Sequence, residues 1–158
     1  RVLECSLDSE GAQGALPDAL DILIVDDDEA ERFLMRRSLE GAGCTHIREA
    51  ESGEQALLMV GQQCPHVLLL DGLMQGMDGV ATCKALREHY SADKLVIVML
   101  SGIEDPAWQR AAMDAGASCF VAKSVSRDKL MDTLTARLAE LDRPLRSRLR
   151  GKPRLSVA

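Results

Sequence analysis

The chain has 158 residues, of which 46% are apolar and 28% are charged, and its net charge is −6. This length corresponds to about one domain, and the apolar share is large enough to bury a core. No apolar run approaches the roughly 18 residues of a membrane span, and no charged-then-apolar leader opens the chain, so we expect neither membrane insertion nor export.

The five cysteines include no C-x-x-C pair, and no histidine stands at zinc-finger spacing from them. Neither a disulfide framework nor a structural metal site is therefore indicated. A reducing compartment suits such a chain, and we expect a cytoplasmic protein.

Short apolar runs alternate with amphipathic stretches after an irregular start. Residues 1–19 lack sustained periodicity, which is typical of a leader or linker. From residue 20 onward the hydrophobic periodicity predicts strands and helices in alternation. In chain order we expect a strand at 21–25, a helix at 29–41, a weaker strand at 45–50, a helix at 53–61, a strand at 66–70, a helix at 79–89, a strand at 95–100, a helix at 106–115, a strand at 118–122 and a helix at 127–141.

This alternation predicts an α/β fold in a single domain over residues 20–141. Right-handed crossovers between parallel strands place helices on both faces of the sheet, so the architecture should be doubly wound. Acidic residues stand at two of the expected helix starts. The dipole of helix 29–41 favours the negative charges of Asp28 and Glu29 at its N-terminus, and Asp78 is a candidate N-cap for helix 79–89.

Residues 142–158 differ from the acidic body of the chain. They contain six basic residues and one acidic residue, a net charge of +5. We interpret them as a solvated basic tail or linker rather than a nucleic-acid or membrane contact. The first residue is Arg rather than Met, which is compatible with an excerpt of a longer protein.

Polar side chains follow four of the predicted strands at their C-terminal ends. The first strand is followed by Asp26–Asp28, the third by Asp71, the fourth by Ser101 and the fifth by Lys123. Ligands bind at the C-terminal edge of an open parallel sheet, so we expect these side chains to converge in space.

The converging residues suit phosphoryl chemistry assisted by a divalent cation. Neighbouring carboxylates repel one another, and a hard cation such as Mg²⁺ relieves that repulsion with oxygen ligands, here from Asp26, Asp27 and Asp71. Lys123 adds a positive charge, and Ser101 adds a hydroxyl donor. These groups would stabilise phosphoryl oxygens during transfer to a carboxylate nucleophile, for which Asp71 is the candidate.

The same residues stand in five ordered motifs, which are Ile22–Asp28, Glu49–Leu57, Val67–Asp71 with Gly76–Gly79, Met99–Gly102 and Gly116–Lys123. Asp71 follows Asp27 by 44 residues, Ser101 follows Asp71 by 30, and Lys123 follows Ser101 by 22. In motifs and intervals, residues 20–141 resemble the receiver domain of two-component response regulators, of the chemotaxis-type single-domain kind. The resemblance implies a flavodoxin-like (βα)5 three-layer sandwich with a five-stranded parallel sheet of order 2-1-3-4-5.

The resemblance also implies how the acids are used. Asp71 would be the phosphoacceptor. Asp27, Asp71 and the backbone carbonyl of Leu73 would bind Mg²⁺, with Mn²⁺ as an alternative, and Asp26 would hold a metal-bound water.

For the remaining matching residues the resemblance implies roles in binding and switching. Ser101, Gly102 and Lys123 would bind the phosphoryl group. Phe120 matches the aromatic switch position, whose side chain turns inward when Ser101 moves toward the phosphate. The physical event would be a gain of charge and size at Asp71 that biases a two-state packing arrangement.

The partners implied are a histidine kinase or a histidine phosphotransfer protein. The chain would be a phosphorylation-activated switch and not an enzyme with a separate substrate. The resemblance also allows a homodimer through helix 106–115, strand 118–122 and helix 127–141, whereas nucleic-acid binding is not indicated within the receiver.

The sequence departs from the family pattern at four positions. Gln75 and Ser124 stand where the family usually has proline, and Ser124 removes an expected cis peptide, because a cis bond before a non-proline residue costs about 2.5–4 kcal/mol. Leu73 and Ile103 are apolar where polar side chains in relatives orient an attacking water. We therefore expect a long-lived acyl phosphate.

Two other functions remain open on the sequence alone. Gln75 and Ser124 are compatible with a degenerate receiver that binds proteins without being phosphorylated. The Asp26-x-Asp28 pattern also resembles haloacid-dehalogenase phosphatases, although Ala30 departs from their pattern and no second acidic pair follows Lys123.

Overall fold

A computed structural model of the chain describes residues 20–74, 76–102 and 105–139. Its strands are β1 (Asp21–Val25), β2 (His46–Ala50), β3 (Val67–Asp71), β4 (Val96–Ser101) and β5 (Cys119–Ala122). Its helices are α2 (Glu29–Gly41), α3 (Gly53–Gln62), α4 (Gly79–Arg87), α5 (Pro106–Asp114) and α6 (Arg127–Leu138). The sequence predicts all of these elements in type and order: β1 and α2 have the predicted bounds, and the ends of the others differ by one to three residues. The predicted end of the last helix, at 141, lies outside the described residues.

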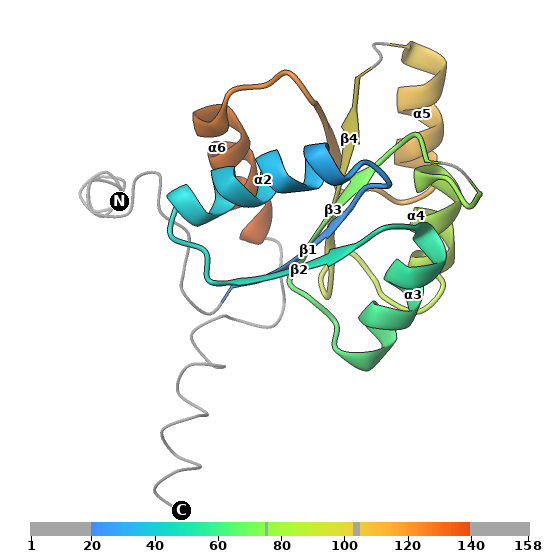
Figure 1. The fold of residues 1–158 in the computed structure, drawn as a ribbon. Helices are drawn as coiled ribbons and strands as arrows, with labels where there is room; N and C mark the ends of the chain where they lie inside the picture. The colour runs from blue at the N-terminus through green and yellow to red at the C-terminus, as the bar shows by residue number, and fades with distance from the viewer. Residues whose placement is uncertain (1–19, 75, 103–104, 140–158) are drawn as a thin grey trace, which may run out of the picture.

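The five strands form one parallel sheet in the order β2-β1-β3-β4-β5. In Figure 1, α2 and α6 lie on one side of the sheet and α3, α4 and α5 on the other. The doubly wound, flavodoxin-like fold with strand order 2-1-3-4-5 is therefore confirmed.

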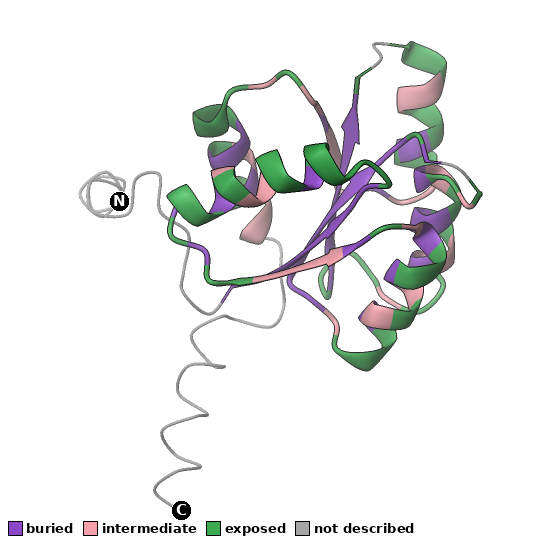
Figure 2. Cartoon of the chain, viewed as in Figure 1, coloured by how far each residue is buried: buried purple, intermediate pink, exposed green. Residues whose placement is uncertain are grey.

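The central strands are buried on both faces, which explains their unbroken apolar runs. Along β1, Ile22 and Ile24 join a core cluster beneath α2 and α6, while Leu23 and Val25 join a second cluster beneath α3, α4 and α5. Figure 2 shows the sheet as the buried layer between exposed helix surfaces. Burial at this scale fixes the strand register, because a shift by one residue would exchange the two faces.

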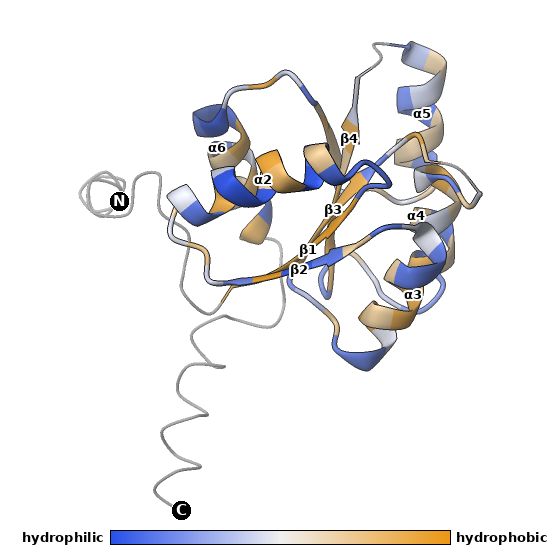
Figure 3. Cartoon of the chain, viewed as in Figure 1, coloured by the Kyte–Doolittle hydropathy of each residue, from blue (hydrophilic) through white to orange (hydrophobic). Residues whose placement is uncertain are grey.

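Hydropathy follows the same layers, because the central strands are apolar whereas the helices carry polar and apolar residues in alternation (Figure 3). Within the described ranges, no helix combines the length and the apolar character needed to cross a bilayer.

Two of the predicted helix-starting acids act as N-caps. The Asp28 carboxylate accepts a hydrogen bond of 2.8 Å from the N–H of Ala30, and α2 follows. The Asp78 carboxylate accepts one of 2.8 Å from the N–H of Ala81, and α4 follows. Both acids satisfy backbone donors that the first helical turn leaves free, which also fixes the loops between each strand and the next helix.

Candidate functional site

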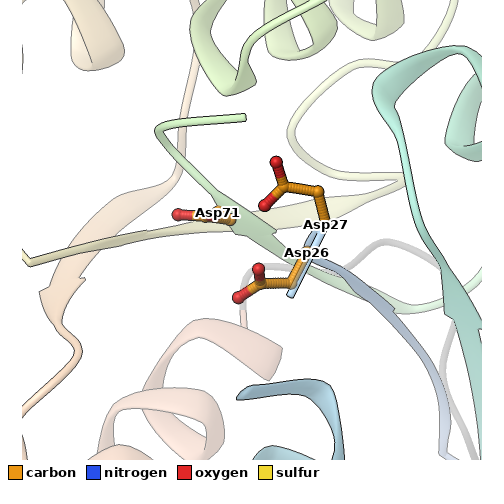
Figure 4. A group of neighbouring side chains, drawn as sticks. All are labelled: Asp26, Asp27 and Asp71. Atoms are coloured by element: carbon orange, nitrogen blue, oxygen red, sulfur yellow. The ribbon is translucent and has the colours of Figure 1, made fainter. Parts of the chain in front are cut away.

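Three carboxylates meet at the C-terminal edge of the sheet. In the parallel pair β1–β3, Val25 lies opposite Leu70, so Asp26 and Asp71 emerge side by side. One carboxylate oxygen from each of Asp26, Asp27 and Asp71 lies within 4.8 Å of the others, and Figure 4 shows the three side chains clustered around the ends of these strands. Asp26 and Asp71 are buried, whereas Asp27 is exposed.

Backbone N–H groups orient the two buried carboxylates. The N–H of Asp28 donates to Asp26 Oδ1 at 2.9 Å. The N–H of Leu73 donates to Asp71 Oδ1 at 3.2 Å. Each contact spans two residues and closes a small turn, so the loops that follow the strands themselves position the acids.

Lys123 brings a positive charge to the same place. Its Nζ lies 3.2 Å from Asp71 Oδ1, 3.4 Å from Asp26 Oδ2 and 3.0 Å from Glu31 Oε1. The backbone N–H of Lys123 donates to the carbonyl of Ser101 at 2.8 Å, which ties the lysine to the end of β4. The two strand-end acids therefore share one ammonium group.

The other predicted phosphoryl-binding residues lie along the same edge. Ser101 is buried at the end of β4, and Gly102 follows it in an exposed position. Phe120 lies on β5, three residues before Lys123, and packs partly buried against the core cluster beneath α3, α4 and α5. The structure therefore places Ser101 one strand from Asp71, and Phe120 on the face of the sheet opposite α2 and α6.

The structure describes two of the four positions at which the sequence departs from the family pattern, Leu73 and Ser124. No cis peptide occurs among the described residues, so the Lys123–Ser124 bond is trans, as predicted. The Leu73 side chain is 53% exposed. Gln75 and Ile103 lie outside the described residues.

The arrangement changes the proton affinity of the site. Burial, and next the negative charge of Asp26, raise the pKa of Asp71 to about 6, against the opposing effects of the Leu73 N–H and Lys123. Burial lowers the pKa of Lys123, but the hydrogen bond to Glu31 and the charges of Asp71 and Asp26 outweigh it and raise that pKa overall. Lys123 thus stays charged at neutral pH, whereas Asp71 becomes protonated when the pH falls through about 6.

Arg32 is a buried charged residue that the sequence reasoning passed over. Its Nη1 donates to the carbonyl of Asp26 at 2.8 Å, and its Nε donates to Glu49 Oε1 at 2.9 Å. The hydrogen bond from Arg36, followed by that from Arg32, holds the pKa of Glu49 below its usual value despite the opposing effect of burial. Arg32 thereby connects the first acid loop to β2.

The donor set fits a hard divalent cation. Asp26, Asp27 and Asp71 offer only carboxylate oxygens, which suit Mg²⁺ or Mn²⁺ better than metals that prefer nitrogen or sulfur ligands. A cation here would relieve the repulsion between carboxylates for which Lys123 alone supplies too little positive charge.

Comparisons with known proteins agree with this geometry. The family model for the response regulator receiver domain matches residues 22–135. Response regulator MprA from Mycobacterium ulcerans is 36% identical over 117 residues, which cover 74% of this chain and 49% of that protein. The chain thus spans about half the length of the curated relatives it matches.

Solved structures show the same fold. The chemotaxis protein CheY4 of Vibrio cholerae superposes with a TM-score of 0.68 at 26% identity, covering 74% of this chain and 97% of that one. The receiver domain of NtrX from Brucella abortus gives a TM-score of 0.69 at 29% identity, covering 75% and 98%. With the family match, the sheet order and the clustered strand-end acids, this chain belongs to the response regulator receiver domains of two-component systems.

Proposed function

We propose that this receiver accepts a phosphoryl group on Asp71 from a phosphohistidine of a histidine kinase or a histidine phosphotransfer protein. The observation that carries the proposal is the position of Lys123, 3.2 Å from Asp71 within a cluster of three carboxylates. The working unit would be residues 20–141, flanked by the 1–19 leader and the basic tail 142–158, in the cytoplasm.

In the proposed reaction, a carboxylate oxygen of Asp71 attacks the phosphorus atom. The bond between phosphorus and the histidine nitrogen breaks, and its electron pair stays on that nitrogen. The ring, which already carries a proton on its other nitrogen, leaves as neutral imidazole. Asp71 must be ionised to attack, which Lys123 favours by pairing with it. After transfer, the ammonium of Lys123 is in place to pair with a phosphoryl oxygen.

Asp26, Asp27 and Asp71, with the backbone carbonyl of Leu73, would hold Mg²⁺ or Mn²⁺, which when bound supplies positive charge for the phosphoryl oxygens. The N–H groups of Asp28 and Leu73 keep the buried acids oriented for that task. Arg32 fixes the backbone of the first acid loop.

Phosphorylation of Asp71 would change the conformation of residues at the end of β4 and on β5. Ser101 and Gly102 would close on the phosphoryl group, and Phe120 would turn inward as Ser101 moves. Because Phe120 packs against the cluster beneath α3, α4 and α5, its movement would alter the packing of that part of the core. The α5–β5–α6 face would then change its affinity for a partner or for a second copy of the chain.

The chemical nature of the linkage tests this function. The purified chain, incubated with Mg²⁺ and the nitrogen–phosphorus donor phosphoramidate, should acquire a phosphate that neutral hydroxylamine removes, because hydroxylamine cleaves acyl phosphates. A phosphate that survives hydroxylamine, as a serine ester does, would contradict the proposal.

A further inference from the structure

Glu31 makes a contact with the site that neither the motifs nor the assigned roles include. It lies in the first turn of α2, and its carboxylate is 3.0 Å from Lys123 Nζ. This is shorter than the distances from the same nitrogen to Asp71, 3.2 Å, and Asp26, 3.4 Å. The Glu31 side chain is 44% exposed, so it reaches the ammonium from the solvent side.

One ammonium therefore faces three carboxylates. When Asp71 becomes phosphorylated, the charge at that position grows toward the −1.5 to −2 that is typical of a phosphorylated side chain. Lys123 would then be the nearest positively charged side chain for the new phosphoryl oxygens. Glu31 remains beside that lysine, competes for its hydrogen-bond donors and repels the added negative charge.

We propose that Glu31 is a positioning residue that restrains Lys123 and opposes the phosphorylated state of Asp71. The inference rests on the proposed function, because it assigns Glu31 a role in phosphoryl binding at that same site. In the free protein, Glu31 would keep the Lys123 ammonium at the site. In the phosphorylated protein, its negative charge would make the acyl phosphate less stable than it would be without Glu31.

The same charge should have the opposite effect on a cation. In the free protein, Glu31 shares the Lys123 ammonium with Asp71 and Asp26, so less of that positive charge offsets these two acids, and the charge of Glu31 adds to the negative potential of the site. Both effects favour a divalent cation. Removal of the Glu31 charge should therefore weaken binding of Mg²⁺ while strengthening binding of an anion, and loss of helix structure would weaken both.

The effects should be modest because the pair is partly exposed. Exposed ion pairs typically contribute 0.2–1 kcal/mol, which corresponds to changes in affinity of up to about fivefold. Glu29 provides a matched control, since it is an exposed acid in the same first turn of α2 and shares any general effect on the helix dipole.

The test compares wild type with Glu31→Gln and Glu29→Gln. Mg²⁺ affinity is measured by calorimetry, and affinity for beryllofluoride, a phosphoryl mimic, by fluorine NMR at saturating Mg²⁺. For Glu31→Gln we expect Mg²⁺ affinity to fall about twofold to fivefold and beryllofluoride affinity to rise about twofold to fivefold. Glu29→Gln should show neither this pair of opposite changes nor changes of this size.

If Glu31→Gln changes both affinities in the same direction, or matches Glu29→Gln, Glu31 is not such a positioning residue, and the proposed function stands. If the wild-type chain binds neither Mg²⁺ nor beryllofluoride, the proposed function is wrong, and the role of Glu31 is wrong with it.

Discussion

The indole of Trp108 lies against the backbone of Gly72, the residue that directly follows Asp71. A Cβ placed on Gly72 would lie 2.0 Å from Cζ2 of Trp108, so the ring occupies the space that any larger residue would need. Trp108 belongs to α5 and also packs against the core cluster beneath α3, α4 and α5. A helix of the proposed α5–β5–α6 output face is thus in direct contact with Gly72, next to the proposed phosphoacceptor.

This contact predicts a cost for adding one methyl group. Gly72→Ala should displace the indole and lower the free energy of unfolding by about 1–3 kcal/mol, as overpacking typically does. Urea unfolding would measure the loss, and Trp108, the single tryptophan, would report the displacement by fluorescence. In a Trp108→Val background the same substitution should cost clearly less.

Gly61→Ala is the control for that measurement. A Cβ at Gly61, in α3, would meet nothing within 4 Å, so alanine should stabilise the chain by about 0.5–1 kcal/mol. Equal effects of the two alanine substitutions would mean that Trp108 does not constrain Gly72.

The raised pKa of Asp71 predicts an unusual dependence of stability on pH. Its ordinary value is 3.8, and in the folded chain without a cation it is about 6. The folded state therefore binds more protons between these values, and the stability contributed by protonated Asp71 is complete below pH 3.8 and lost as the pH rises through about 6.

Asp71→Asn should remove this loss. In EDTA at about pH 8, the variant should be more stable than wild type by roughly 1–3 kcal/mol, and the difference should shrink toward zero in acid. Asp27→Asn, at the exposed acid of the cluster, should gain much less. Urea unfolding of the three proteins at both pH values checks this, and an Asp71→Asn variant no more stable than wild type at high pH would count against the assigned pKa.

Arg32 should support both the fold and the acid loop. Arg32→Met keeps much of the side-chain volume but leaves the Asp26 carbonyl and Glu49 without its hydrogen bonds. We expect a loss of about 1–3 kcal/mol in the free energy of unfolding, together with weaker Mg²⁺ binding. Arg37→Met is the control, because Arg37 is exposed and its guanidinium lies over the Phe33 ring, and its effect should stay within about 0.5 kcal/mol.

The exposed apolar side chain of Leu73 predicts a slowly hydrolysed acyl phosphate. It lies in the loop after Asp71 and offers no polar group to orient an attacking water. Decay of the phosphate in purified protein should therefore be slow, and Leu73→Gln should accelerate it, whereas Leu58→Gln, at an exposed leucine of α3, should not. Decay within seconds in the wild-type chain would contradict this expectation.

The fold and the clustered acids could be predicted because they depend on patterns that are local in sequence. The run Val67–Leu70 is apolar throughout because the strand is buried on both faces. Parallel pairing then places whatever follows each strand at one edge, which is how Asp26, Asp71 and Lys123 meet.

Contacts that depend on helix rotation and side-chain conformation could not be predicted in this way. Glu31 and Trp108 reach the site from helices whose exact orientation follows from packing of the whole domain. Arg32 left a weak signal, since its spacing from Met35 and Leu39 places it on the core-facing side of α2. Arginine is seldom buried without a partner, so that position already required an acid such as Glu49 nearby.

The role of Asp71 as the phosphoacceptor is tested most directly by intact-mass measurement. Wild type and Asp71→Asn are each incubated with Mg²⁺ and a small phosphodonor, and their intact masses are then measured by mass spectrometry. Wild type should gain the mass of one phosphate, and Asp71→Asn should gain none. A mass gain that persists in Asp71→Asn would place the acceptor on another residue and contradict the account.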